Sequence, residues 1–250
     1  MDLIERAIVM TQRHPWEVSR GRFFLNVLAD ARTFDRPGAV LDVGSGDAWF
    51  AQQLLKRAQP GSRVTCWDSG YSDQPDFLRT SAASDAVAYA ADEPDGRFQT
   101  ILLLDVLEHV EDDRGFLSAI VTAHAADDAT VLISVPAWPR LFSRHDVKLR
   151  HHRRYTPAQA RRLISASGLH IIREGGLFHL LLAPRALQVM VERLGIGEKE
   201  AKDLGQWTHG PLVSALVSAV LRTDNAVSKQ SSMLGVSLPG LSWWALCRKA

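Results

Sequence analysis

The stretch VLDVGSGDA, residues 40–48, runs from apolar side chains into two closely spaced glycines. The apolar, partly β-branched residues predict a buried strand, and the following DAWFAQQLLKRA (47–58) has helical spacing. Glycines between a strand and a helix let the backbone approach a ligand closely, with the helix N-terminus just beyond. This stretch therefore predicts an α/β fold that binds a ligand at the turn.

The alternation of strands and helices continues outward from this turn. Apolar runs predict strands at 38–46, 62–68, 86–92, 97–105, 129–137 and 169–177, with a short closing strand in 241–250. Helical patterns occupy 110–125 and 156–168, residues 1–35 form an amphipathic helical segment, and 178–236 contains two apolar helical segments. Strands this apolar indicate a mainly parallel sheet with helices on both faces.

Composition limits the class of protein. The chain has 250 residues, a net charge of +1 and only two cysteines, Cys66 and Cys247, which excludes a disulfide framework or a cysteine zinc site. The N-terminus lacks the pattern of a signal peptide. The apolar stretches at 177–184 and 211–221 are shorter than the roughly 20 residues of a membrane span. We expect a cytoplasmic protein, with contact at the inner membrane face left open.

The residues around the glycine turn define the charge of the ligand. Trp49 stands where a dinucleotide-binding turn needs its third glycine, and Asp42 and Asp47 would repel a phosphate. Asp68 ends the second strand 22 residues after Gly46, where an acid commonly accepts hydrogen bonds from a ribose. The expected ligand is therefore a nucleoside joined to a cationic group instead of a pyrophosphate. S-adenosylmethionine fits this description.

The ordered segments VLDVGSGDA, CWD (66–68), FQTILLLDVLEHV (98–110) and VLISVPA (131–137) resemble the class I S-adenosylmethionine-dependent methyltransferases. The resemblance covers residues 38–177 and implies a Rossmann-like, seven-stranded, mainly parallel sheet with a helical insertion before the last strand. It divides one domain into an N-terminal helical lid (1–35), a cofactor-binding core (36–177), an insertion (178–236) and the last strand (237–250). Trp16 or Phe23 would close the lid over the cofactor, and packing of these side chains in the core is the alternative.

The resemblance also assigns cofactor contacts. It implies that Asp42, Gly44, Ser45 and Gly46 hold the methionine part of S-adenosylmethionine and that Asp68 holds the ribose. At Ala48 the family most often has a third glycine. The remaining contacts are expected from the ends of the third and fourth strands, namely Ala91 and Asp92 at the adenine, and Asp105 and Val106 at the cofactor rim.

The segment LLLDVLEHV, residues 102–110, places Glu108 and His109 after Asp105 on the acceptor side. A hydroxyl acceptor must lose a proton, and histidine is the side chain suited to accept it near neutral pH. Glu108 and His109 are therefore candidate catalytic residues. The segment also resembles the acid-x-x-Glu-His segment that holds a divalent ion in some O-methyltransferases. Metal binding is therefore an alternative, but we assign no metal ligands. Local packing is the third alternative.

The segment WPRLFSRHDVKLRHHRRYT, residues 138–156, carries a net charge of +5. It follows the fifth strand, so it is expected to wall the acceptor pocket and meet an anionic or carrier-linked group. His145 is a further candidate catalytic residue, and His151 is an alternative base or metal ligand. The same arginines alternatively form a solvated face that pairs with residues 111–113, while Tyr155 packs the segment down. One short basic segment does not predict nucleic-acid binding.

The sequence thus predicts an S-adenosylmethionine-dependent methyltransferase that methylates a hydroxyl of a small or carrier-linked acceptor, whether aromatic, polyene or lipid-linked. The alternatives are N- or C-methylation, metal-assisted O-methylation, and a cofactor-binding subunit without catalysis. Residues 178–236 are expected to wall an apolar acceptor pocket, to lie against a membrane, or to form a dimer face. A monomer and a homodimer both fit the sequence.

Overall fold

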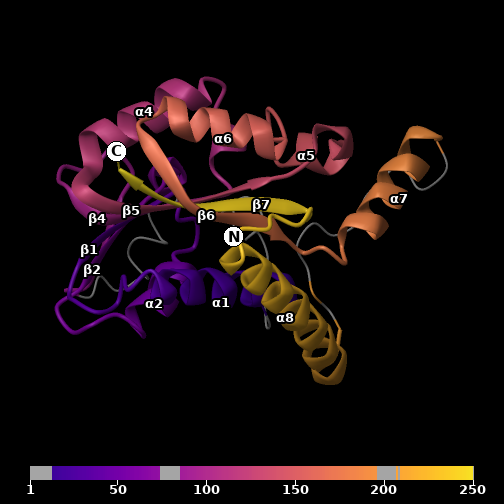
Figure 1. The fold of residues 1–250 in the computed structure, drawn as a ribbon, viewed down its shortest axis with the longest axis horizontal. Helices are drawn as coiled ribbons and strands as arrows, with labels where there is room; N and C mark the ends of the chain where they lie inside the picture. The colour runs from indigo at the N-terminus through magenta and orange to yellow at the C-terminus, as the bar shows by residue number, and fades with distance from the viewer. Residues whose placement is uncertain (1–12, 74–84, 196–206, 208, 250) are drawn as a thin grey trace.

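The computed structural model describes residues 13–73, 85–195, 207 and 209–249, and it contains one seven-stranded sheet (Figure 1). The strand order is β3-β2-β1-β4-β5-β7-β6. Strand β7 is antiparallel to β5 and β6, and the other neighbours pair in parallel. The predicted mainly parallel α/β fold is confirmed. The strands are β1 (Ala39–Val43), β2 (Arg63–Trp67), β3 (Val87–Ala90), β4 (Phe98–Leu104), β5 (Ala125–Pro136), β6 (Leu169–Leu177) and β7 (Ser242–Lys249).

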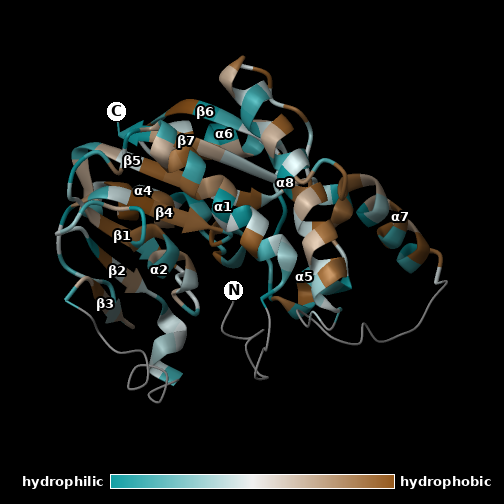
Figure 2. Ribbon diagram, turned by 90° about the horizontal axis from the view of Figure 1, so that it is seen from below, coloured by the Kyte–Doolittle hydropathy of each residue, from teal (hydrophilic) through white to brown (hydrophobic). Residues whose placement is uncertain are grey.

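Helices cover both faces of the sheet, as Figure 1 shows. One face packs against α4 (Asp113–His124) and α6 (Pro157–Ala166), and the other packs against α1 (Pro15–Asp30), α2 (Trp49–Leu55) and α8 (Pro211–Met233). Neighbouring residues of β4 alternate between the two cores, since Ile101 and Leu103 contact the first layer and Leu102 the second. The hydropathy colouring in Figure 2 follows this pattern, with apolar strands between the layers.

Two further helices lie beside the strand ends. The short helix α5 (Arg144–Lys148) belongs to the segment after β5, and α7 (Leu182–Arg193) projects from the body of the molecule in Figure 1. The 3-10 turns η2 (Ser69–Asp73), η3 (Leu107–His109) and η4 (Pro139–Leu141) complete the connections that the site uses. The helix predicted at 156–168 begins with a capping box between Thr156 and Gln159.

The two aromatic side chains considered for the N-terminal lid lie in different surroundings. Phe23 is buried and meets the ring of Trp244 edge to face, with centroids 5.2 Å apart, so it belongs to the core and does not close the site. Trp16 stacks on Phe178 at 5.4 Å and lies under the guanidinium of Arg20. Phe23 thus follows the core-packing alternative, because the helical period turns its side chain toward the sheet. Residues 1–12 of the expected lid lie outside the described residues.

Gly176 of β6 is required by the close approach of two backbones. A Cβ atom at this position would lie 2.2 Å from the carbonyl oxygen of Leu238 and 2.4 Å from the amide nitrogen of Gly240. We expect Gly176→Ala to lower the free energy of unfolding by about 1–3 kcal/mol, because the core is overpacked and the backbone must shift. Urea denaturation followed by circular dichroism measures this change.

Gly210→Ala is the matched control, since nothing lies within 4 Å of a Cβ there. Its effect should stay below about 1 kcal/mol. Equal unfolding midpoints for Gly176→Ala and wild type would show that the strand tolerates the added methyl group.

Candidate active site

The glycine turn after β1 places every second residue from 44 to 48 in a left-handed conformation. Gly44 and Gly46 have φ angles of 62° and 53°, and Ala48, which precedes α2, has φ 55°. A Cβ at Gly44 would lie 2.8 Å from a methyl carbon of Val106. The backbone therefore follows the path that the sequence predicted, and Ala48 adopts a left-handed conformation that glycine would adopt without strain.

Asp68 holds this turn against the end of β2. Its two carboxylate oxygens accept hydrogen bonds from the amides of Gly46, at 2.8 Å, and Gly70, at 2.9 Å. The buried hydroxyl of Tyr71 donates to the carbonyl of Gly46 at 2.8 Å and lies 2.8 Å from the Ser45 hydroxyl. Tyr71 was missed from the sequence, because nothing in its local pattern separates it from a surface residue of the turn.

Asp42 sits beneath the turn as a buried carboxylate. Its Oδ2 atom has no hydrogen-bond partner among the described residues, and burial raises the pKa of Asp42 to about 7. It lines a cavity of about 40 Å³ together with Gly44, Ser45 and the α1 residue Arg20. An unpartnered buried carboxylate at the floor of a cavity is suited to bind a cationic group.

Asp105 follows β4 in a left-handed conformation, with φ 60°. Its Oδ1 accepts a hydrogen bond from Ser134 of β5 at 2.7 Å, and its Oδ2 pairs with Arg20 of α1. Asp47 pairs in the same way with Arg13. Two arginines from the N-terminal segment therefore neutralise two of the carboxylates that surround the turn.

The strand ends place the predicted cofactor residues along one edge. Parallel register sets Asp42 of β1 beside Leu102 of β4 and Cys66 of β2, so the residues that follow these strands meet at the carboxyl edge. Ala91 and Asp92 come directly after β3, whose last residue, Ala90, accepts a hydrogen bond from the Asp68 amide. They lie two strands away from β1, at the far end of this edge.

Glu108, His109 and His151 converge beyond the end of β4. One ligand atom from each of these side chains lies within 4.8 Å of the others. The rings of His109 and His151 meet edge to face, with centroids 4.6 Å apart. The sequence placed Glu108 toward the acceptor, but its side chain is fully buried and both carboxylate oxygens lack partners among the described residues. Burial raises the pKa of Glu108 to about 8.

Asp146 of α5 organises the segment that supplies His151. Its buried carboxylate accepts hydrogen bonds from Arg154 at 2.7 Å and from the Ser143 amide at 3.0 Å, and lies 3.0 Å from Nδ1 of His151. Burial opposes its charge, but the contacts with His151 and Arg154 outweigh this, and the pKa of Asp146 lies well below its usual range. Arg185 of α7 completes the cluster at 3.4 Å.

Residues 138–156 therefore combine a structural role with a place at the site. Arg153 pairs with Asp113 at 3.1 Å and Tyr155 donates to the same carboxylate at 2.7 Å, as the alternative of local pairing predicted. The amide of His152 donates to the carbonyl of Glu108 at 2.7 Å. His145 is half-buried, and burial, with the nearby charge of Arg185, lowers its pKa to about 4. His145 is thus uncharged near neutral pH.

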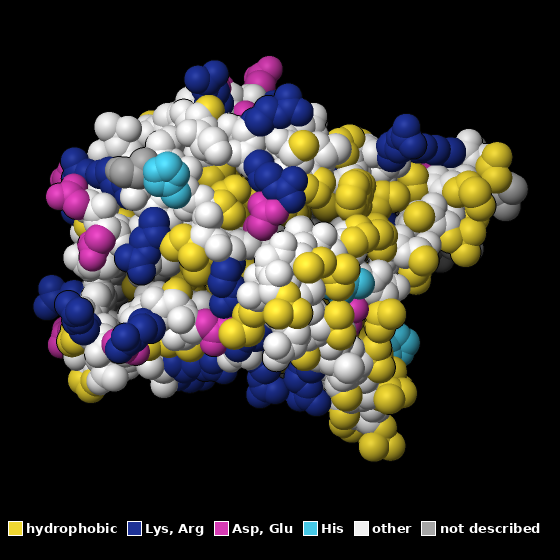
Figure 3. Space-filling model, in the orientation of Figure 1, with side chains coloured by type: hydrophobic (Ala, Val, Ile, Leu, Met, Phe, Trp, Pro, Cys, Tyr) yellow, Lys and Arg dark blue, Asp and Glu magenta, His cyan; other side chains and the backbone are white. Residues whose placement is uncertain are grey.

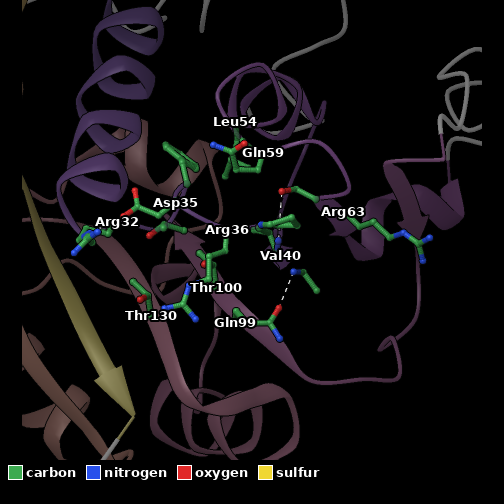
Figure 4. Close-up of a pocket in the computed structure, with 18 of the residues that line it drawn as sticks. Arg32, Asp35, Arg36, Val40, Leu54, Gln59, Arg63, Gln99, Thr100 and Thr130 are labelled. Carbon is green, nitrogen blue, oxygen red and sulfur yellow. Dashed lines mark hydrogen bonds and ion pairs between the residues drawn. The ribbon is translucent and has the colours of Figure 1, made fainter.

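A wide groove lies at the opposite edge of the sheet, away from these residues. It has a volume of about 1220 Å³ and is formed by residues 31–38 and the amino ends of the strands. Figure 4 shows Arg32, Asp35 and Arg36 above Gln99, whose side chain accepts a hydrogen bond from the Ala39 amide at 2.7 Å. The candidate site residues of the sequence lie at the carboxyl edge, where ligands of open α/β sheets bind.

Comparison with known proteins agrees with this geometry. The model of a family described as a methyltransferase domain matches residues 19–174. No curated protein matches the chain by sequence. Among solved structures, a proposed sarcosine dimethylglycine methyltransferase from Galdieria sulphuraria is similar, with a TM-score of 0.57 and 13% identity over 93% of this chain and 86% of its own.

Two further structures show the same fold. An S-adenosylmethionine-dependent methyltransferase from Archaeoglobus fulgidus has a TM-score of 0.51 and 12% identity, and the match covers 92% of this chain and 94% of that one. The cyclase SpnF has a TM-score of 0.53 and 14% identity, over 97% and 84% of the two chains. At these identities the likeness concerns the fold, and one fold carries different chemistries.

The buried carboxyl of Glu108 gives the protein a defined response to pH. Its pKa is about 8 in the folded state and 4.5 ordinarily, so the folded state retains a proton that the unfolded state loses above pH 4.5. This contribution to stability therefore falls as pH rises from about 4.5 to about 8. Glu108→Gln removes the ionisation. The melting temperature of the variant minus that of wild type should therefore be several degrees larger at pH 9 than at pH 5.

Thermal melts in a buffer that contains a chelator measure this difference. Glu111→Gln, an exposed carboxyl three residues along, is the control and should follow the wild-type profile. A difference in melting temperature between Glu108→Gln and wild type that stays constant from pH 5 to pH 9 would contradict the raised pKa of Glu108.

Proposed function

This chain belongs to the methyltransferase domain family and uses S-adenosylmethionine, and from this premise we propose that it methylates a hydroxyl group of a small or carrier-linked acceptor. The observation that carries the proposal is the convergence of Glu108, His109 and His151 at the carboxyl edge. Imidazoles beside the end of β4 are suited to receive the proton of a hydroxyl acceptor. Amine acceptors have less need of such a group.

The residues of the glycine turn fit the cofactor. The unpartnered Oδ2 of Asp42 offers a carboxylate to a cation, and Gly44 and Gly46 leave no side chain over the turn. We assign the methionine part to Asp42, Gly44, Ser45 and Gly46, the ribose to Asp68, and the adenine to Ala91 and Asp92, with Asp105 and Val106 at the rim. S-adenosylmethionine supplies a methyl group on a positively charged sulfur.

Helix α1 controls access to this position. The cavity at the turn has a volume of about 40 Å³, and Glu17, Arg20 and Gly21 of α1 form one of its walls. Pockets for small molecules usually have volumes of about 300–1,000 Å³. We therefore propose that these α1 side chains move away from the turn when the cofactor enters.

We assign the general base to His109. It lies on η3, directly after the strand whose end borders the glycine turn, and its ring contacts His151. His145, with a pKa of about 4, is a poor base near neutral pH. Glu108 is buried and protonated below about pH 8, so it supports His109 from beneath and does not take the proton itself.

Metal-assisted O-methylation is a second candidate, and one observation favours it. Glu108, His109 and His151 bring an oxygen and two nitrogen atoms together, a donor set that suits a divalent ion. The contact between Nδ1 of His151 and Asp146 leaves Nε2 available, as in many histidine ligands of metals. In this alternative Glu108, His109 and His151 would hold the ion, which when bound would lower the pKa of the acceptor hydroxyl.

The assignment of Asp42 predicts a loss of cofactor affinity in Asp42→Asn. A charge-assisted hydrogen bond contributes about 1.5–3 kcal/mol, so the dissociation constant of S-adenosylhomocysteine should rise about ten-fold to a hundred-fold. Isothermal titration calorimetry measures it, with the exposed Asp35→Asn at the opposite edge as control. An unchanged dissociation constant in Asp42→Asn would remove Asp42 from the cofactor site.

The assignment of His109 predicts that His109→Asn lowers kcat by about a hundred-fold to ten-thousand-fold with hydroxyl acceptors, because the proton has no acceptor. Methyl transfer from labelled S-adenosylmethionine to a panel of phenols, alcohols and amines measures this, and the affinity for S-adenosylhomocysteine should not change. His145→Asn is the control and should retain most of the activity.

Two outcomes of this experiment would revise the proposal. Transfer to amines alone, at a rate that His109→Asn leaves unchanged, would replace O-methylation with N-methylation. Activity that disappears with a chelator and returns with Mg²⁺ or Mn²⁺, in proportion to bound metal, would favour the metal-assisted reaction over the imidazole base.

A further inference from the structure

Helix α8 packs a mostly polar side against the protein and exposes apolar side chains to solvent. Five of its six buried residues are polar, namely Ser214, Asp224, Asn225, Ser228 and Ser232. The polar side fixes the helix to the body of the molecule, since Asn225 donates to the carbonyl of Ser19 on α1 at 3.2 Å and Ser228 donates to the carbonyl of Gly176. Leu221 is buried in the core, whereas other apolar side chains of the helix point outward, with Leu212 85% and Leu216 66% exposed.

Helix α7 has an apolar outer side as well. Leu187, Met190 and Leu194 recur every three or four residues and are more than half exposed, whereas Val189 is the buried residue of the helix. Of the fifteen exposed large apolar residues in the described chain, twelve lie in residues 180–236. Scattered exposed apolar residues are ordinary, but such a concentration marks an interaction surface. Figure 3 shows these side chains gathered over α7 and α8.

Cationic side chains border this apolar surface. Arg193 of α7 donates to the carbonyl of Arg140 at 2.8 Å, and the Arg144 amide donates to Glu192 of α7 at 2.9 Å. Arg140, Arg144 and Arg193 are exposed, and the guanidinium of Arg144 lies 3.5 Å from Glu192, so Arg140 and Arg193 carry the positive charge at this border. The surface therefore combines exposed apolar side chains with positive charge. A partner that matches it is both apolar and anionic.

The positive charge distinguishes between two possible partners for this surface, a second copy of the chain and an anionic bilayer. A two-fold dimer would place the same patch on both subunits, which brings one cationic segment toward its copy. An anionic bilayer offers hydrocarbon to the leucines and phosphate to the arginines. No described helix combines the length and apolar character that crossing a bilayer requires. The uncharged stretch 211–221 would therefore lie in the plane of the membrane surface.

We propose that α7 and the first half of α8 form a docking face for an anionic lipid bilayer, with Leu187, Met190, Leu212 and Leu216 in the interface and Arg140 and Arg193 at the head groups. This goes beyond the proposed reaction and does not depend on it. The face adjoins the acceptor side, because Arg185 of α7 contacts Asp146, whose carboxylate orients His151. Docking thus sets the acceptor side close to the lipid surface.

Vesicle co-sedimentation of the full chain tests this proposal. Vesicles of phosphatidylcholine with about one third phosphatidylglycerol should bind the protein, pure phosphatidylcholine vesicles should bind it at least ten-fold more weakly, and 0.5 M salt should weaken the first interaction. The double variant Leu212→Ser/Leu216→Ser should bind at least ten-fold more weakly, since it removes apolar surface that would be buried in the bilayer. Arg140→Gln/Arg193→Gln should bind anionic vesicles about thirty-fold more weakly, because two attractive charges near the membrane surface are lost.

Ile172→Ser is the matched control, because Ile172 is 50% exposed on β6 outside the docking face. It should bind vesicles as wild type does. Calorimetry with S-adenosylhomocysteine on every variant confirms folding and keeps a failure of docking distinct from a failure of the methyltransferase site.

Two results would overturn the proposal. One is that wild type and the leucine double variant bind anionic vesicles equally, or that neither binds. The other is that light scattering finds a dimer that Leu212→Ser/Leu216→Ser dissociates, without vesicle binding by wild type, which would assign the face to a second copy.

Discussion

Helices bury both faces of β1, β4 and β5, and this burial leaves only the strand ends for charged groups. A carboxylate in the middle of these strands would lose its hydration without a partner. Asp68 and Asp105 accordingly stand just beyond the ends of their strands, and Asp42, the penultimate residue of β1, is the buried exception that faces the site. Parallel pairing brings these ends to one edge, so residues far apart in the sequence form one site.

A second set of contacts builds the acceptor side from residues 138–156. The buried carboxylate of Asp146 connects Arg154, His151 and Arg185, and Tyr155 ties the same segment to η3 through the carbonyl of Leu107 at 3.0 Å. Internal ion pairs thus neutralise part of the positive charge of the segment. His151 reaches Glu108 and His109 only because these contacts hold the segment against η3.

The region between β6 and β7 follows a different rule from the core. The core buries apolar residues, whereas α8 buries serines, Asp224 and Asn225 together with the single leucine Leu221, and it leaves Leu212, Leu216 and Val213 exposed. Oδ2 of Asp224 and Oδ1 of Asn225 have no partners among the described residues, so this packing contributes little by itself. The apolar outer side makes sense when a further surface covers it, and the adjoining arginines indicate its charge.

Local patterns in the sequence determined the strands, the glycine turn and the family resemblance, because apolar runs and glycines act over a few residues. They predicted that Gly44 and Gly46 form the cofactor turn and that the last part of the chain is a strand. Tertiary structure alone decided three things. It buried Glu108, it turned Phe23 into the core, and it brought His151 to His109 from 42 residues away. It also exposed the apolar side of α8, since helical period shows that a stripe exists and only packing decides which stripe faces the protein.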